Sequence, residues 1–307
     1  MKSFLVRLVL VCLLASIPLA AIAADEPSYS RKEELIYGRK HGMALTLEVF
    51  VPKQSANGIG VVVVSSGGWS SPIPFVPPIM LPELCSRGYT AFVVTHGSQP
   101  KFTIPEILED MHRALRYIRY HAKDYKIDPD RIGITGMSAG GHLSLMQGTG
   151  GKMGDAKASD PIDRVSSRVQ AVGCFFPPSD FLNYGKTGEE AIGTGTLKDF
   201  RAAFDLHQFD SKTHALERIT DDSKRLELGR KISPITHVSK ESAPSLIIHG
   251  DADKLVPIQQ AEVILAKLKE AGVATELVIK PGLAHGWPGM EKDMKPIVDW
   301  FDKYLRK

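Results

Sequence analysis

The stretch GITGMSAGGH (133–142) sets Ser138 between small residues, directly after an apolar run that is typical of a β-strand. Its centre has the G-x-S-x-G spacing, in which a serine sits on a strained strand-to-helix turn and small neighbours let strand and helix approach closely. The start of that helix brings free N–H groups beside the hydroxyl. Such a serine is a nucleophile only if the chain also supplies a base, a group that orients the base and donors for an oxyanion.

An acid and a base follow Ser138 in the order that acyl-transfer chemistry uses on this kind of turn. The stretch LIIHGDADKLVP offers Asp251 and Asp253 after a buried strand pattern, and KPGLAHGWPG offers His285 in a loop bounded by glycine and proline. The interval between the aspartates and His285 has room for one helix and one strand. All three groups are therefore expected at the same edge of a sheet.

The elements that would position these residues alternate along the chain. In the first expected strand apolar and polar residues alternate, as in a strand with one exposed face. The later runs are almost continuously apolar, which is typical of strands buried on both faces. The runs are Leu45–Pro52, Val61–Ser66, Ala91–His96, Arg131–Gly136, Val169–Phe176, Pro244–Gly250 and Glu276–Pro281. Helical patterns fit residues 104–126, 258–271 and 291–305 and the segment after Ser138. This alternation predicts an α/β protein with a doubly wound, mostly parallel β-sheet, whose ligand sites lie at the carboxyl ends of the strands.

One segment, about residues 181–231, does not fit the alternation. It has many charges and no buried-strand pattern, and Leu197, Phe200 and Phe204 share one face of an expected helix. A segment of about 50 residues between two core strands is an insertion rather than a loop. We expect a helical cap over the site, with a solvated decoration at the side of the domain as the alternative.

Residues 1–23 have the features of an export signal. Lys2 and Arg7 accompany an apolar run that ends in the cleavage pattern Ala21-Ile22-Ala23, and this run is short for a membrane span. An uncleaved anchor is the alternative. We expect a secreted or periplasmic protein with no stable membrane span after signal cleavage, formed by one domain over residues 24–307.

The charge balance and the cysteines narrow the possible partners. Loss of Lys2 and Arg7 with the signal lowers the formal net charge from +3 to +1, which predicts no nucleic-acid partner. Cys85 and Cys174 are expected as buried thiols in a helix and a strand, with a disulfide between them as the alternative. Neither lies in a metal-ligand spacing, so no metal site is predicted.

Together, GMSAGGH, LIIHGDADKLVP and GLAHGW resemble the α/β-hydrolase superfamily. The similarity points to the esterase/acetyl-esterase (lipase-like) group and to the catalytic domains of prolyl-oligopeptidase-like and dienelactone-hydrolase-like enzymes. The resemblance implies that Ser138 is the nucleophile and His285 the general base and later acid. It also implies that Asp253 is the orienting carboxylate, because the pattern His-Gly-x-x-Asp places the acid at the second of the two aspartates, not at Asp251. Asp251 would then stabilise the turn.

The resemblance further implies an oxyanion hole with two backbone donors. One is the N–H of Ala139, and the other comes from SSGGW (65–69), after the second expected strand. Related enzymes often carry His-Gly-Gly-Gly here, so this sequence departs from the pattern at its first two positions. Gly68 or Trp69 is the expected second donor.

Several other polar and aromatic residues are expected near the site. Trp287 and His96 are candidates for the walls of the substrate pocket, with plain packing and a structural histidine as the respective alternatives. His142 and His249 are expected in structural roles.

The function that these motifs predict is a cofactor-independent serine carboxylic-ester hydrolase. It would act through an acyl-enzyme on small-molecule or carbohydrate esters, with acylated carbohydrate implied by resemblance only. A prolyl-oligopeptidase-like serine peptidase is the first alternative, although the mature residues before Leu45 leave no room for a propeller domain. The second is a non-catalytic binding protein with a hydrolase fold, which only the departure at SSGGW favours.

Overall fold

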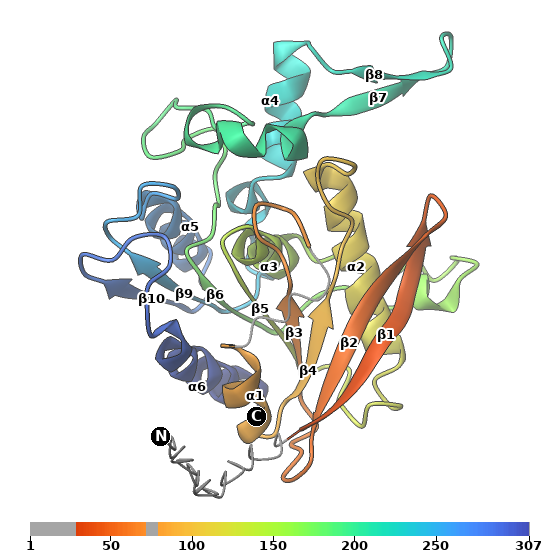
Figure 1. Ribbon diagram of the computed structural model, residues 1–307, viewed down its shortest axis with the longest axis vertical. Helices are drawn as coiled ribbons and strands as arrows, with labels where there is room; N and C mark the ends of the chain where they lie inside the picture. Colours follow the sequence, from red (N-terminus) through yellow and green to blue (C-terminus); the bar gives the residue numbers. More distant parts are fainter. Residues whose placement is uncertain (1–28, 72–78, 307) are drawn as a thin grey trace, which may run out of the picture.

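The structure, a computed structural model, describes residues 29–71 and 79–306, so the expected signal at residues 1–23 lies outside the described residues. Its main strands are β1 (Tyr29–Lys40), β2 (Met43–Pro52), β3 (Gly60–Val64), β4 (Thr90–Val94), β5 (Ile132–Met137), β6 (Ala171–Phe175), β9 (Ser245–Gly250) and β10 (Thr275–Lys280). They form one sheet in the order β1-β2-β4-β3-β5-β6-β9-β10 (Figure 1). Pairing is parallel from β4 to β10 and antiparallel between β1, β2 and β4. The expected doubly wound, mostly parallel sheet is confirmed.

Helices cover both faces of this sheet. Helices α2 (Ile104–Tyr120), α3 (Ala139–Gly150) and α5 (Gln259–Glu270) contribute to one apolar cluster. Helices α1 (Leu81–Ser86) and α6 (Met294–Leu305) contribute to a second one. The valines of β3 alternate between the two clusters, because successive side chains of a strand point to opposite faces. The inner strands are therefore buried on both sides.

Three elements differ from the sequence-based expectations. Strand β1 was not predicted, because its charged sequence YSRKEELIYGRK does not alternate; it pairs with β2 through its backbone and carries two register shifts. Helix α2 ends at Tyr120, six residues short of the expected Lys126, and turns follow it. Strand β10 was expected to be buried on both faces, but it is the edge strand and Ile279 is 46% exposed.

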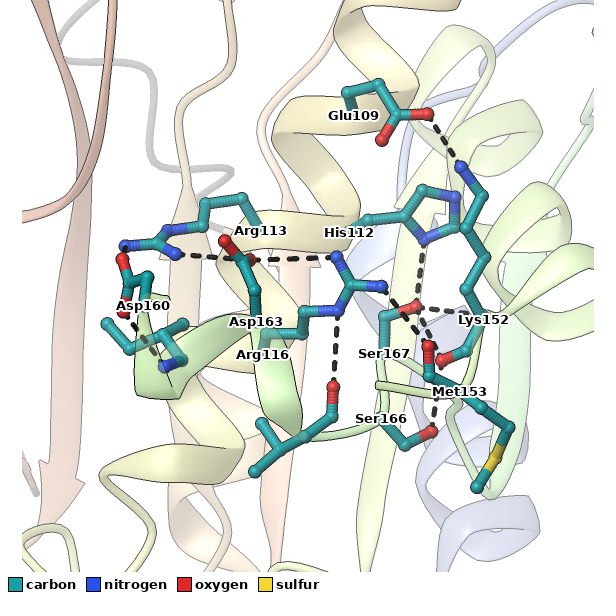
Figure 2. A network of polar contacts seen from close by, with 12 residues as sticks. Glu109, His112, Arg113, Arg116, Lys152, Met153, Asp160, Asp163, Ser166 and Ser167 are labelled. Atoms are coloured by element: carbon teal, nitrogen blue, oxygen red, sulfur yellow. Dashed lines mark hydrogen bonds and ion pairs between the residues drawn. The ribbon is translucent and has the colours of Figure 1, made fainter. Parts of the chain in front are cut away.

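A polar network fixes α2 to the segment between α3 and β6 (Figure 2). The guanidinium of Arg113 pairs with Asp160 at 2.7 Å and with Asp163 at 3.1 Å. The imidazole of His112 is bonded through Nδ1 to the hydroxyl of Ser167 at 2.9 Å. Burial and, to a smaller extent, the charge of nearby Lys152 lower the pKa of His112 to about 4, so this imidazole is neutral near pH 7.

The insertion lies between β6 and β9. It contains the 3₁₀ segment η2 (Gly195–Phe204), the two-stranded ribbon β7 (His207–Asp210) and β8 (Ala215–Arg218), and α4 (Asp222–Lys231). In Figure 1 it lies beyond the ends toward which the arrows of β3 and β4 point, which are the carboxyl ends of these strands. The prediction of a regular helix around Phe200 is wrong, since η2 consists of short 3₁₀ turns with a kink at that residue. Leu197 and Phe204 are buried as expected.

The two ends of the insertion meet at one point, which we call the neck. The backbone N–H of Phe181 donates to the hydroxyl of Ser233 at 3.0 Å, and the N–H of Ile235 donates to the carbonyl of Ser179 at 3.2 Å. Both serines are fully buried. The chain therefore leaves the domain and returns to it at the neck.

The cysteines of the described residues are both buried and free: Cys85 in α1 and Cys174 in β6. Burial raises the pKa of the Cys85 thiol to about 12. Within residues 29–71 and 79–306, every helix is too short or too polar to span a bilayer.

Candidate active site

Ser138 lies on a sharp turn between β5 and α3. Its backbone has φ 53° and ψ −119°, a conformation that L-residues rarely adopt and that stores strain. A Cβ on Gly136 would lie 2.5 Å from the backbone of Gly140, and a Cβ on Gly140 would lie 2.8 Å from the carbonyl oxygen of Val64. The two glycines of the motif are therefore what lets α3 start so close to the strands.

The structure brings Ser138, His285 and Asp253 into one chain of hydrogen bonds. Asp253 follows β9 and His285 follows β10, so both stand with Ser138 at the carboxyl edge of the sheet. The His285 Nε2 atom lies 2.9 Å from the Ser138 Oγ atom, and His285 Nδ1 lies 2.7 Å from Asp253 Oδ2. This geometry fits a nucleophile, a base and an orienting acid.

The carboxylate of Asp253 is held in its ionised form. Its side chain is fully buried, which by itself raises the pKa. Hydrogen bonding to His249 and His285, and the bond from the Val256 backbone N–H to Oδ1 at 2.9 Å, outweigh burial and hold the pKa of this carboxyl well below its usual range. Asp253 can therefore stabilise a positively charged imidazole without taking its proton.

Asp251 has a different place. It is exposed, and its Oδ1 atom accepts a hydrogen bond from the backbone N–H of Gly282 at 2.6 Å. This bond ties the loop that carries Asp253 to the loop that carries His285. The carboxylate of Asp251 thus supports the two loops. The carboxylate that bonds to the His285 imidazole is that of Asp253.

Phe176 is a site residue that the sequence reasoning missed. It follows β6 with φ 34° and is buried, and its ring centroid lies 4.4 Å from that of His285. Its ring also lies 5.7 Å from that of Trp287. An aromatic residue at the end of an apolar strand is typical of the core, so the only signal was its position at the carboxyl end of β6.

The two predicted pocket residues lie in different surroundings. Trp287 follows His285 in the same loop, is half-buried, and donates its indole N–H to Asp293 at 2.7 Å. His96 is 3% exposed, and its Nδ1 lies 2.6 Å from the carbonyl oxygen of Gly97. Burial lowers the pKa of His96 to about 4. Within the described part of the chain, no hydrogen bond or ring contact joins His96 to Ser138, Asp253 or His285, which fits a structural histidine.

Residues 65–70, here called the oxyanion loop, follow β3. Gly67 and Ser70 exchange two backbone hydrogen bonds at 2.9 and 3.0 Å, which close a tight turn. Gly68 and Trp69 inside the turn have φ 55° and 59°, and both of their carbonyls accept hydrogen bonds from Gln99. In residues 29–71 and 79–306 the N–H groups of Gly68 and Trp69 have no intramolecular acceptor, so either can serve as a donor with Ala139 at the start of α3.

The insertion packs directly on the oxyanion loop. The ring of Phe200 lies over Gly68 so closely that a Cβ there would come within 2.4 Å of it. The ring of Phe204 lies 5.1 Å from that of Trp69 in an edge-to-face arrangement. The insertion therefore helps to set the position of the loop.

The chain is similar to esterases in both sequence and fold. A profile of the protein family described as BD-FAE matches residues 47–268. The probable carboxylic ester hydrolase LipM of Mycobacterium tuberculosis is 27% identical over 247 residues, which cover 79% of this chain and 52% of LipM. A truncated carbohydrate esterase from gut microbiota has a TM-score of 0.74 at 25% identity, over 92% of this chain and 99% of that one. An acetyl ester-xyloside bifunctional hydrolase from Caldicellulosiruptor lactoaceticus has a TM-score of 0.68 at 26% identity, over 88% and 93% of the two chains. The chain thus spans about half the length of LipM and nearly all of the two solved structures.

Proposed function

Because this chain belongs to the BD-FAE family, we propose that it is a serine carboxylic-ester hydrolase that acts through Ser138, His285 and Asp253. The solved esterases of like fold confirm that the domain has the α/β-hydrolase fold expected from the sequence. The observation that carries the proposal is the unbroken hydrogen-bond chain from the Ser138 hydroxyl through the His285 imidazole to the Asp253 carboxylate.

In the proposed mechanism, the Oγ atom of Ser138 attacks the ester carbonyl carbon while His285 Nε2 takes the hydroxyl proton. Asp253 stays ionised and stabilises the imidazolium. His285 then returns the proton to the leaving alcohol, and an acyl-enzyme forms on Ser138. A water molecule, deprotonated by the same histidine, attacks this ester; His285 then gives that proton to Ser138 Oγ as the bond to the acyl group breaks, and the carboxylic acid is released.

Two backbone donors stabilise the oxyanion in this scheme. Ala139 supplies one N–H from the first turn of α3, and Gly68 or Trp69 supplies the other from the oxyanion loop. One such donor is worth about 3 kcal/mol of transition-state stabilisation, because charge develops on the oxygen only as the tetrahedral intermediate forms.

We propose acylated carbohydrates as the substrate class and an extracellular or periplasmic location. The substrate class rests on the two solved structures, which are named as a carbohydrate esterase and an acetyl ester-xyloside hydrolase. The location rests on the export-signal pattern of residues 1–23. A secreted enzyme of this kind would meet polymeric esters that do not enter cells.

The purified protein tests the proposal. It should release nitrophenol from short acyl esters and acetate from acetylated xylan. Ser138→Ala and His285→Ala should abolish both activities while the circular dichroism spectrum stays that of the wild type. A wild-type protein that neither hydrolyses an ester nor reacts with an organophosphonate probe would refute the proposal.

The same preparation separates the alternatives. A peptidase of the prolyl-oligopeptidase type would release nitroaniline from dipeptidyl nitroanilides faster than it hydrolyses esters. A panel of acyl chain lengths, together with feruloyl esters, would define the acyl group that the site accepts.

A further inference from the structure

The imidazole of His142 is held by two hydrogen bonds that fix its tautomer. The indole N–H of Trp69 lies 3.1 Å from His142 Nδ1, and an indole nitrogen can only donate. Nδ1 therefore carries no proton, and Nε2–H donates to the carbonyl oxygen of Ile232 at 2.7 Å. The side chain is fully buried, and burial lowers its pKa to about 4, which keeps the ring neutral near pH 7.

These bonds connect three parts of the molecule that meet at the site. His142 lies one turn into α3, and its backbone N–H donates to the carbonyl of Ser138 at 2.9 Å. Trp69 belongs to the oxyanion loop, and Ile232 directly follows α4, where the insertion returns to the domain. One imidazole thus links the turn of the nucleophile, the oxyanion loop and the insertion.

The oxyanion loop needs such a support. Gly68 and Trp69 both have positive φ, and for a tryptophan this conformation is strained and persists only where its surroundings impose it. The buried indole is enclosed by the rings of His142, Phe181 and Phe204, at centroid distances of 5.7, 5.9 and 5.1 Å. To this packing the bond to His142 adds a directional restraint on the indole, and with it on the backbone of Trp69.

We propose that His142 and Trp69 are positioning residues, which through their mutual hydrogen bond hold the N–H groups of the oxyanion loop where the tetrahedral intermediate needs them. The inference rests on the proposed ester hydrolysis and assigns it two further residues. Neither side chain touches the reacting atoms. Their effect is to keep donors aligned with an oxyanion, which is sensitive to small displacements.

Trp69→Phe is the sharpest test, because it removes the indole N–H and keeps an aromatic ring. Activity toward 4-nitrophenyl acetate should fall roughly tenfold in kcat, with KM changed less than about twofold, because the lost alignment matters only in the transition state. The affinity for a trifluoromethyl ketone, which forms a tetrahedral adduct on the serine, should fall by the same factor as kcat/KM.

Trp300→Phe is the matched control. Trp300 is also buried and donates its indole N–H to a carbonyl, that of Pro244, but it lies in α6. It should lower the thermal midpoint about as much as Trp69→Phe does and leave kcat unchanged. His142→Leu should lower kcat like Trp69→Phe, and the double variant should be little worse than either single one, since both changes break the same bond.

The possible results are distinct. Wild-type kcat in Trp69→Phe, or an equal loss in Trp300→Phe, would overturn the assignment, as would losses that simply multiply in the double variant. If the His142→Leu variant does not fold, the comparison of Trp69→Phe with Trp300→Phe still tests the assignment. A wild type without esterase activity would refute the proposed function and this inference with it, whereas an active wild type with an unaffected Trp69→Phe variant would refute the inference alone.

Discussion

The ring of Phe176 packs against the imidazole of His285, with the centroids 4.4 Å apart and the planes inclined by 56°. Hydrogen bonds to Ser138 and Asp253 restrain the two nitrogens of that imidazole, but they leave rotation about the line that joins them. The aromatic contact restricts this remaining motion. Phe176 is itself fixed by a bond from its N–H to the carbonyl of Ile248 at 2.9 Å.

Phe176→Leu should therefore lower kcat for ester hydrolysis by roughly tenfold, since a general base must be held in the reactive geometry. Phe301→Leu, at a fully buried position in α6, is the control for the loss of aromatic packing. Steady-state kinetics and thermal midpoints of both variants check this. Equal kcat values in the two variants would show that the contact is only structural.

The two aspartates should behave very differently. Asp253→Asn removes the charge that stabilises the imidazolium and should lower kcat by about 10³- to 10⁴-fold. Asp251→Asn keeps an oxygen that can accept from Gly282 and should cost less than about twofold in kcat. Burst kinetics with a nitrophenyl ester measure both effects, and a large loss in Asp251→Asn alone would mean that the acid is misassigned.

The neighbouring glycines of the oxyanion loop provide a matched pair. Gly68→Ala places a methyl group 2.4 Å from the ring of Phe200 at a backbone with φ 55°, so the loop or the insertion must shift. Gly67→Ala meets no atom within 4 Å and has no positive φ. We expect a loss of kcat of at least roughly tenfold in the first variant and near wild-type kinetics in the second. Similar kinetics in both variants would contradict the close contact between Phe200 and the loop.

Buried neutral histidines should make the fold sensitive to mild acid. Burial lowers the pKa of both His96 and His142 to about 4, from an ordinary value near 6.5. Between about pH 6.5 and pH 4 the unfolded chain binds the protons that the folded chain does not. Stability therefore falls as the pH falls, by about 1.4 kcal/mol per pH unit for each histidine. The depressed pKa of Asp253 adds a loss of stability only below about pH 4.

Urea unfolding at a series of pH values between 4 and 7 checks this expectation. His96→Asn can still donate to Gly97, because its amide nitrogen takes the place of Nδ1, and it should reduce the slope of unfolding free energy against pH by about one proton. His214→Gln, at an exposed histidine of the insertion, is the control for the loss of a histidine. A wild-type stability that does not change over this range would show that these histidines are not held neutral by the fold.

The parts of the fold that depend on local patterns could be predicted from the sequence. Buried strands produce short apolar runs, and Ile107, Met111, Leu115 and Ile118 recur at helical spacing in α2 and are all fully buried. The glycines around Ser138 reflect a steric need of the turn, so the elbow could be located and its partners sought at the next strand ends.

What could not be predicted depends on contacts between distant residues. The bond between Trp69 and His142 joins positions that are 73 residues apart and leaves no periodic trace in the sequence. The kink at Phe200 arises where η2 packs on Gly68, and β1 forms because the backbone of β2 offers it partners. Phe176 was overlooked because its role comes from a positive φ at the end of β6.

The neck has a consequence for how this domain can diverge. Because the insertion starts and ends beside the same buried pair, Phe181 and Ser233, its length can change without altering the distance that the chain must bridge. The entropic cost of closing a loop also grows only with the logarithm of its length. The parts of the insertion that do not touch the oxyanion loop, such as the β7–β8 ribbon, can therefore change in length, while Phe200 and Phe204 keep their places on that loop.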